Sequence, residues 1–171
     1  MTALTLPGRP ESARAAREFA AGCLAGCPSC DDAVLCVDEL VVNAIQHSRS
    51  GLPGGTVEVR IAVAAGEWLR VEVQDAGPLA PAVPAQRGPL DERGRGLALV
   101  VSLAEVFGVD GGLRWFWMPW APGVREAWDR RTFAEVISVA EAAGWAPDSG
   151  ASRPVPCEVR VRGLHHAGGV A

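Results

Sequence analysis

Two polar side chains of a predicted helix are the residues best suited to chemistry. Glu39 and Asn43 are four positions apart, so on a helix they stand one above the other on the same face. At 100° per residue, Cys36 and His47 fall near them, and an apolar stripe lies opposite, formed by Val34, Val37, Val41, Ala44 and Ile45. Carboxylate and amide oxygens suit a magnesium-phosphate centre, as ligands or by orienting water. The alternative is an ordinary solvated face of a surface helix.

A second candidate is a carboxylate at the end of a predicted strand. The apolar residues of 68–74 alternate toward one side, and Asp75 continues their parity, so it is expected on the buried side. An unpaired buried carboxylate shifts its pKa or costs several kcal/mol, so a ligand offering an N–H donor would explain it. The alternative is that Asp75 caps the turn that begins at Gly77.

A third candidate is a glycine turn at the start of a predicted helix over residues 96–108. Gly94 and Gly96 allow a backbone to approach phosphate, and a helix N-terminus supplies free N–H groups. Arg93 and Arg95 add positive charge suited to an anion. A single Gly-x-Gly is a weak signal, and solvation alone also explains a loop rich in arginine.

A small set of helices and strands must position these candidates. Residues 76–93 contain four prolines and are predicted to form a lid loop. Residues 157–163 suggest a short strand near the end of the chain. Hydrophobic periodicity predicts helices over 11–25, 31–47, 96–108 and 125–143, and strands over 56–64, 68–74 and 113–118, the first two strands paired as a hairpin.

Length and composition fit one globular domain. The chain has 171 residues, of which 49% are hydrophobic and 21% charged. A net charge of -4 argues against direct binding of nucleic acid. No leader-like segment or apolar run long enough for a membrane span is evident, and five cysteines do not suggest a disulfide framework. We therefore expect a cytoplasmic protein with reduced thiols and no membrane partner.

Three separated motifs, DELVVNAIQHS, VQDAG and RGRGLALV, resemble in their order the N, G1 and G2 boxes of the Bergerat-fold (GHKL) ATPases. That group contains gyrase, MutL and the histidine kinases. The short length, the NAIQH sequence and the compact lid look most similar to the branch of anti-sigma-factor serine/threonine kinases. The resemblance covers about residues 10–118. It implies an α/β two-layer sandwich, with a mixed, mostly antiparallel sheet covered on one face by helices.

The resemblance also implies roles for individual residues. Glu39 would act as general base or orient the nucleophile, Asn43 would coordinate Mg2+, and Asp75 would accept from the adenine amino group of ATP. The other residues at the nucleotide would be Gly77, Arg93, Gly94, Arg95, Gly96 and Leu97.

The implied function is regulatory. The protein would bind a sigma factor, phosphorylate a serine or threonine of an anti-sigma-factor antagonist, and form a homodimer. The ATP-binding domain is expected to span residues 1–120, and residues 121–171 would be a C-terminal helix and tail of unknown role.

One departure favours an alternative function. Members of the group often carry Asp-x-Gly-x-Gly in the G1 box, whereas this chain has Pro78 and Leu79 after Gly77. Proline removes a backbone donor at that point. The alternative is a partner-binding module that has the fold but has lost catalysis.

Other residue patterns suggest rival sites. Cys23, Cys27 and Cys30 have a spacing that suits an iron-sulfur cluster or zinc, but cysteines in a helical pattern also pack as small hydrophobes. The six tryptophans of the chain could form a docking surface or belong to the core. His165 and His166 resemble a metal-binding pair. The alternative is that two adjacent histidines in a glycine-rich terminus have no metal-binding role.

Overall fold

The computed structural model describes residues 1–79, 95–121 and 158–161. The predicted helix over 125–143, Arg93, Gly94, most of the predicted lid and the His165–His166 pair lie outside these residues. The described elements are β1 (Thr2–Pro7), α1 (Ser12–Cys23), α2 (Cys30–His47), β2 (Thr56–Ala64), β3 (Trp68–Gln74), α3 (Arg95–Leu103), β4 (Val106–Asp110), β5 (Leu113–Pro119) and β6 (Glu158–Val161), with a 3-10 turn at Arg49–Gly51.

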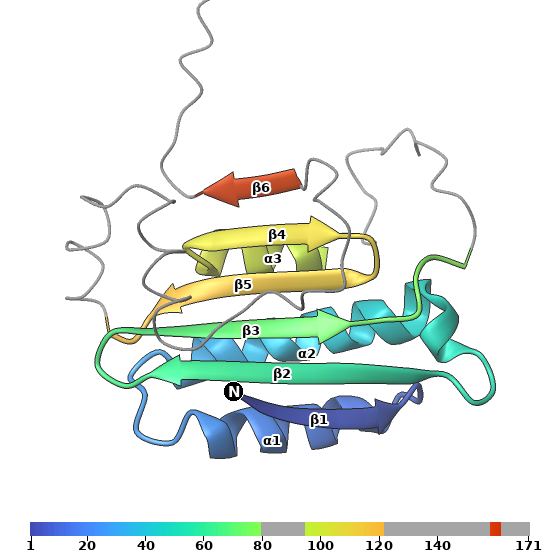
Figure 1. Cartoon of the computed structure of the whole chain (residues 1–171), viewed down its shortest axis with the longest axis horizontal. Helices are drawn as coiled ribbons and strands as arrows, with labels where there is room; N and C mark the ends of the chain where they lie inside the picture. The colour runs from blue at the N-terminus through green and yellow to red at the C-terminus, as the bar shows by residue number, and fades with distance from the viewer. Residues whose placement is uncertain (80–94, 122–157, 162–171) are drawn as a thin grey trace, which may run out of the picture.

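The six strands form one sheet in the order β1-β2-β3-β5-β4-β6, and each described pair is antiparallel. The three described helices lie together behind this sheet in the view of Figure 1. The predicted two-layer sandwich with helices on one face is therefore confirmed. The predicted bounds of β2 and β3 and the hairpin between them are confirmed as well.

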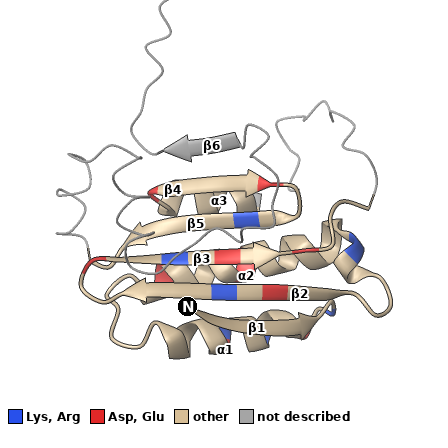
Figure 2. Ribbon diagram, in the orientation of Figure 1, with Lys and Arg blue, Asp and Glu red and all other residues tan. Residues whose placement is uncertain are grey.

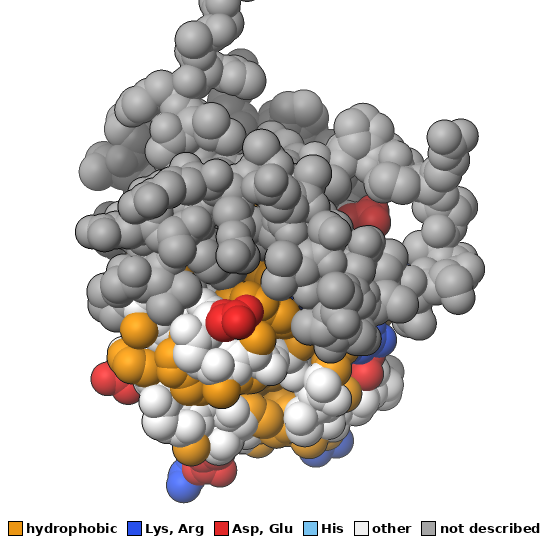
Figure 3. Space-filling model, turned by 60° about the vertical axis from the view of Figure 1, so that its left-hand side comes forward, with side chains coloured by type: hydrophobic (Ala, Val, Ile, Leu, Met, Phe, Trp, Pro, Cys, Tyr) orange, Lys and Arg blue, Asp and Glu red, His pale blue; other side chains and the backbone are white. Residues whose placement is uncertain are grey.

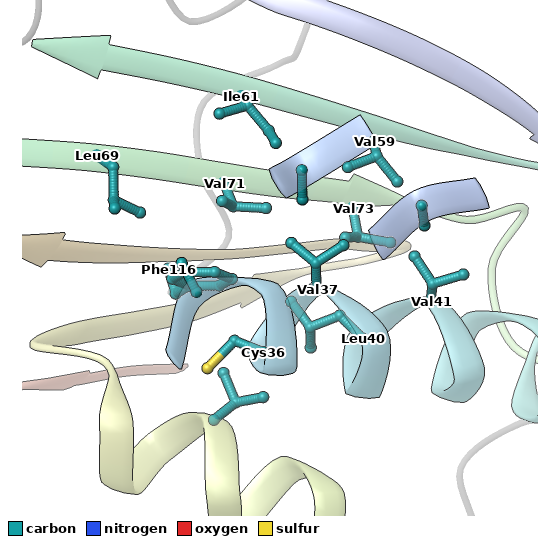
Figure 4. Close-up of a cluster of buried hydrophobic side chains, with 14 of the residues drawn as sticks. Cys36, Val37, Leu40, Val41, Val59, Ile61, Leu69, Val71, Val73 and Phe116 are labelled. Atoms are coloured by element: carbon teal, nitrogen blue, oxygen red, sulfur yellow. The ribbon is translucent and has the colours of Figure 1, made fainter. Parts of the chain in front are cut away.

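Helix α2 packs directly against the sheet. Asp31 and Asp32 lie in its first turn, where carboxylates favour the free N–H groups and the helix dipole. Its inner face buries Val37, Leu40 and Val41 completely. These side chains point at those of β2 and β3, and Val59, Ile61, Leu69, Val71, Val73 and Phe116 form the facing surface (Figure 4). Burying each such side chain contributes about 1.5–3 kcal/mol, so this contact fixes the distance between α2 and the sheet.

The opposite face of the sheet carries a second buried cluster. The Trp68 and Trp117 ring centroids lie 4.7 Å apart, and the guanidinium of Arg70 lies 4.6 Å from the Trp115 ring centroid. Arg70 also pairs with Glu72 at 2.7 Å. Figure 2 shows these charges beside those of β2. Trp68, Trp115 and Trp117 are therefore core residues rather than a docking surface.

The predicted helix over 96–108 is wrong in its second half. Helix α3 ends at Leu103, and Val106–Asp110 form β4, which pairs with β5 through a tight turn. Gly108 must be a glycine because the Trp115 ring lies where a Cβ would stand. The periodicity of a buried apolar run of this length does not distinguish a strand from a helix. The pairing with β5 makes Val106–Asp110 a strand.

Two smaller departures occur at the sheet margins. Strand β1 was not predicted, because only Leu4 and Leu6 alternate toward the core and the segment is short. Val63 has the predicted parity, but it is 38% exposed near the end of β2.

In the described part of the chain, no helix is long and apolar enough to cross a membrane. Where described residues are visible in Figure 3, charged side chains of both signs are scattered among apolar ones.

Candidate functional site

The outer face of α2 presents the predicted polar pair. Glu39 and Asn43 are both half-buried, and His47 is exposed in the last turn. Cys36 does not join them, contrary to the sequence-based expectation. It is fully buried in the core, and burial, with smaller effects of Asp32 and Glu39, raises the pKa of its thiol to about 12. The polar face therefore consists of a carboxylate and an amide, with the imidazole at its end.

Helix α3 begins directly against this polar pair. A Cβ built on Gly96 would lie 3.0 Å from Glu39 Cδ, closer still to Glu39 Oε2, and 3.6 Å from Asn43 Nδ2. A larger residue at this position would push the Glu39 carboxylate away from the first turn of α3. The free N–H groups expected at this helix start therefore lie near a carboxylate and an amide, which suits a metal-bound phosphate.

Asp75 lies on the buried side of the sheet, as its parity predicts. Its side chain is only 1% exposed, and its backbone N–H donates to the Gly112 carbonyl at 2.9 Å. Its Oδ1 accepts from the Gly77 N–H at 2.7 Å, and its Oδ2 is paired with Arg114. The alternative role, in which Asp75 caps the turn at Gly77, is therefore confirmed. The carboxylate therefore already has partners within the protein.

The loop after β3 is fixed against the loop after α2. The Ala76 N–H donates to Ser50 Oγ at 2.9 Å, and Arg49 donates its backbone N–H to the Gly77 carbonyl at 2.9 Å. The Arg49 guanidinium also donates to the Ala76 carbonyl at 3.0 Å. Gly77 has a φ of 79°, which favours glycine. These bonds tie the strand end that carries Asp75 to the C-terminal end of the helix that carries Glu39 and Asn43.

The structure thus assembles part of the predicted residue set. Glu39, Asn43 and Gly96 come together, and Asp75 and Gly77 form a second group at the end of β3. Arg95 begins α3, and Leu97 is partly buried against the core. Sequence reasoning missed Ser50, Arg49 and Arg114, since a loop serine and isolated arginines have no local signal that marks them.

The cysteine cluster is a packing feature. Cys27 is buried, and its thiol donates to the Trp120 carbonyl at 3.4 Å, while Cys23 and Cys30 pack against the core. Burial raises the pKa of all three thiols above the usual value. Among the described residues, no three metal-ligating side chains converge. The predicted packing role therefore fits, and the metal site does not.

An open hollow of about 410 Å³ lies elsewhere, beside the loop that precedes β2. Its lining carries one charged side chain, Arg9, and otherwise consists of Pro7, Gly8 and residues 51–56. Its lining carries no carboxylate or side-chain amide, which are the usual ligands of Mg2+. The polar face of α2 remains the chemically suited site.

Comparison with known families agrees with this geometry. The family model described as histidine kinase-like ATPase domain matches residues 6–120, which is more than half of the chain. A search of curated proteins finds no match. The matched stretch contains α2, the end of β3 and the start of α3, which carry the candidate residues. The chain therefore belongs to the histidine kinase-like ATPase domain family, and residues 6–120 are an ATP-binding domain of that family.

Proposed function

We propose that this domain is a regulatory serine/threonine kinase, which binds Mg-ATP and phosphorylates a hydroxyl group of an anti-sigma-factor antagonist. It also holds a sigma factor and acts as a homodimer. The observation that carries the proposal is the approach of Gly96 to Glu39 and Asn43, because it places a helix N-terminus beside a carboxylate and an amide. Phosphoryl transfer depends on this kind of positioning and charge stabilisation.

Each of the three residues has a distinct role. The Asn43 side-chain oxygen would hold Mg2+, which would supply positive charge to offset that of the phosphates. Gly96 would line the phosphates through its backbone, since it has no side chain of its own. Glu39 would accept the proton of the attacking hydroxyl. The hydroxyl oxygen would then bond to the γ-phosphorus, and the bond from the γ-phosphorus to the leaving ADP would break.

A phosphoryl-transfer assay tests the proposal. Wild-type protein is incubated with Mg2+, radiolabelled ATP and candidate antagonist proteins, and label on the antagonist is measured. Glu39→Gln is expected to lose transfer by at least about 100-fold, because the general base is removed. Asp38→Asn is the matched control: Asp38 neighbours Glu39 in sequence but pairs with Arg17 of α1. Equal transfer by wild type and Glu39→Gln would contradict the role of Glu39.

A partner-binding module without catalysis is the second candidate. Two features support it, namely Pro78 directly after Gly77 and the pairing of Asp75 with Arg114. This candidate predicts sigma-factor binding that is independent of nucleotide and no label on any antagonist. Light scattering of the purified protein, alone and with a sigma factor, measures the proposed dimer and complex.

A further inference from the structure

The Asp75 carboxylate at the end of β3 already forms an ion pair with Arg114. Asp75 Oδ2 is paired with the Arg114 guanidinium, and Asp75 Oδ1 accepts the Gly77 N–H at 2.7 Å. The Asp75 side chain is 1% exposed, whereas that of Arg114 is 22% exposed. One oxygen is therefore held by the turn of its own loop, and the other by a side chain with access to solvent.

The sheet register places Arg114 at this carboxylate. Strand β5 pairs with β3 so that Arg114 lies opposite Val73, two residues before Asp75. The β4–β5 turn closes the same space, because a Cβ on Gly112 would lie 2.8 Å from Asp75 Oδ1 and 2.9 Å from Gln74 Nε2. Of these neighbours, Arg114 is a long side chain that can rotate away, whereas Gly77 and Gly112 act through backbone.

We propose that Arg114 controls how well this site recognises the base of its nucleotide. Its guanidinium donates to Asp75 Oδ2, so an adenine amino group that approaches this oxygen competes with Arg114 for it. This inference rests on the proposed role of Asp75 in adenine recognition. An exchange of donors yields little net free energy, since the partner already present must be given up.

The exchange has two consequences that a merely structural arginine would not have. In the wild type, the amino group of adenine adds little to affinity, because its contact with Asp75 costs the contact with Arg114. In Arg114→Met, the carboxylate is left buried without its cation, so a ligand that offers an N–H donor is bound more tightly. The substitution thus lowers the stability of the free protein while it raises affinity for ATP.

The test is a calorimetric titration of the full-length protein with Mg-ATP and with the Mg complex of purine riboside triphosphate, which lacks the 6-amino group. We expect less than about threefold discrimination between them in the wild type, and at least about tenfold in Arg114→Met, with ATP itself bound about tenfold more tightly by the variant. Arg114→Lys, which keeps a cation, should stay close to the wild type. Arg14→Met is the control for loss of charge, since Arg14 pairs with Glu18 on the exposed side of α1.

The outcomes separate this inference from the proposed site. If the wild type binds ATP and Arg114→Met binds it no more tightly and with no greater preference for the amino group, Arg114 does not control base recognition. If neither protein binds either nucleotide at millimolar concentration, the nucleotide site itself is refuted, and the inference falls with it. Tight binding by Arg114→Met alone would support both. Circular dichroism and thermal unfolding establish that each variant is folded before titration.

Discussion

Replacement of Gly96 by alanine should separate stability from function. Gly96 has no positive φ and lies in the first turn of α3, so alanine fits its backbone and should stabilise the helix by up to about 1 kcal/mol. The new Cβ would lie 3.0 Å from Glu39 Cδ and well inside van der Waals contact with Glu39 Oε2. The carboxylate is the end of a flexible side chain and must retreat by on the order of 1 Å. A misplacement of that size typically lowers a rate by about 100-fold.

Gly22→Ala is the matched control for this substitution. Gly22 lies in helix α1, and a Cβ there has no neighbour within 4 Å. Both variants are compared by urea unfolding, Mg-ATP titration and phosphoryl transfer. Gly22→Ala should gain stability and keep the other two properties, whereas Gly96→Ala should also gain stability but lose transfer. Wild-type transfer by Gly96→Ala would refute the inference that the close approach of α3 positions Glu39 for chemistry.

Three further predictions concern the core, the loop anchor and pH. Phe116→Ala should lower the free energy of unfolding by about 3–5 kcal/mol, measured by urea unfolding, because Phe116 is fully buried between the sheet and α2. Ser50→Ala should cost about 1–3 kcal/mol and weaken ATP binding in calorimetry, because the Ala76 N–H loses its acceptor near Asp75. The raised pKa of Cys36, about 12 against 9.0, means that the unfolded thiol ionises first, so the free energy of unfolding should fall between about pH 9 and 12. Cys36→Ala should show a smaller fall over that range, and an unchanged slope would contradict the assignment.

Local patterns were sufficient for several elements. Strands β2 and β3 were predicted with their observed bounds, because their residues alternate with period two and Gly66 lies in the turn between them. Helix α2 was predicted from its apolar stripe and its hydrophobic periodicity. The parity of β3 then correctly placed Asp75 on the buried side.

Features that depend on distant parts of the chain were not predictable in this way. Val106–Asp110 read as helix because the run is apolar throughout, and only its pairing with β5 makes it a strand. The partner of Asp75 is Arg114, 39 residues away, and the β3–β5 register brings the two together. Cys36 was placed with the polar residues by its helical angle, but α3 packs on that side of α2 and leaves it in the core.

The claim that Mg-ATP is held by Asn43 and the backbone at Gly96 is tested most directly by calorimetric titration. Mg-ATP is titrated into the wild-type protein and into Asn43→Ala, which removes a half-buried side chain outside the core. Saturable binding by the wild type, weakened at least about tenfold in the variant, is the predicted result. Absence of wild-type binding at millimolar nucleotide, or equal affinity in the two proteins, would contradict the assignment of this site.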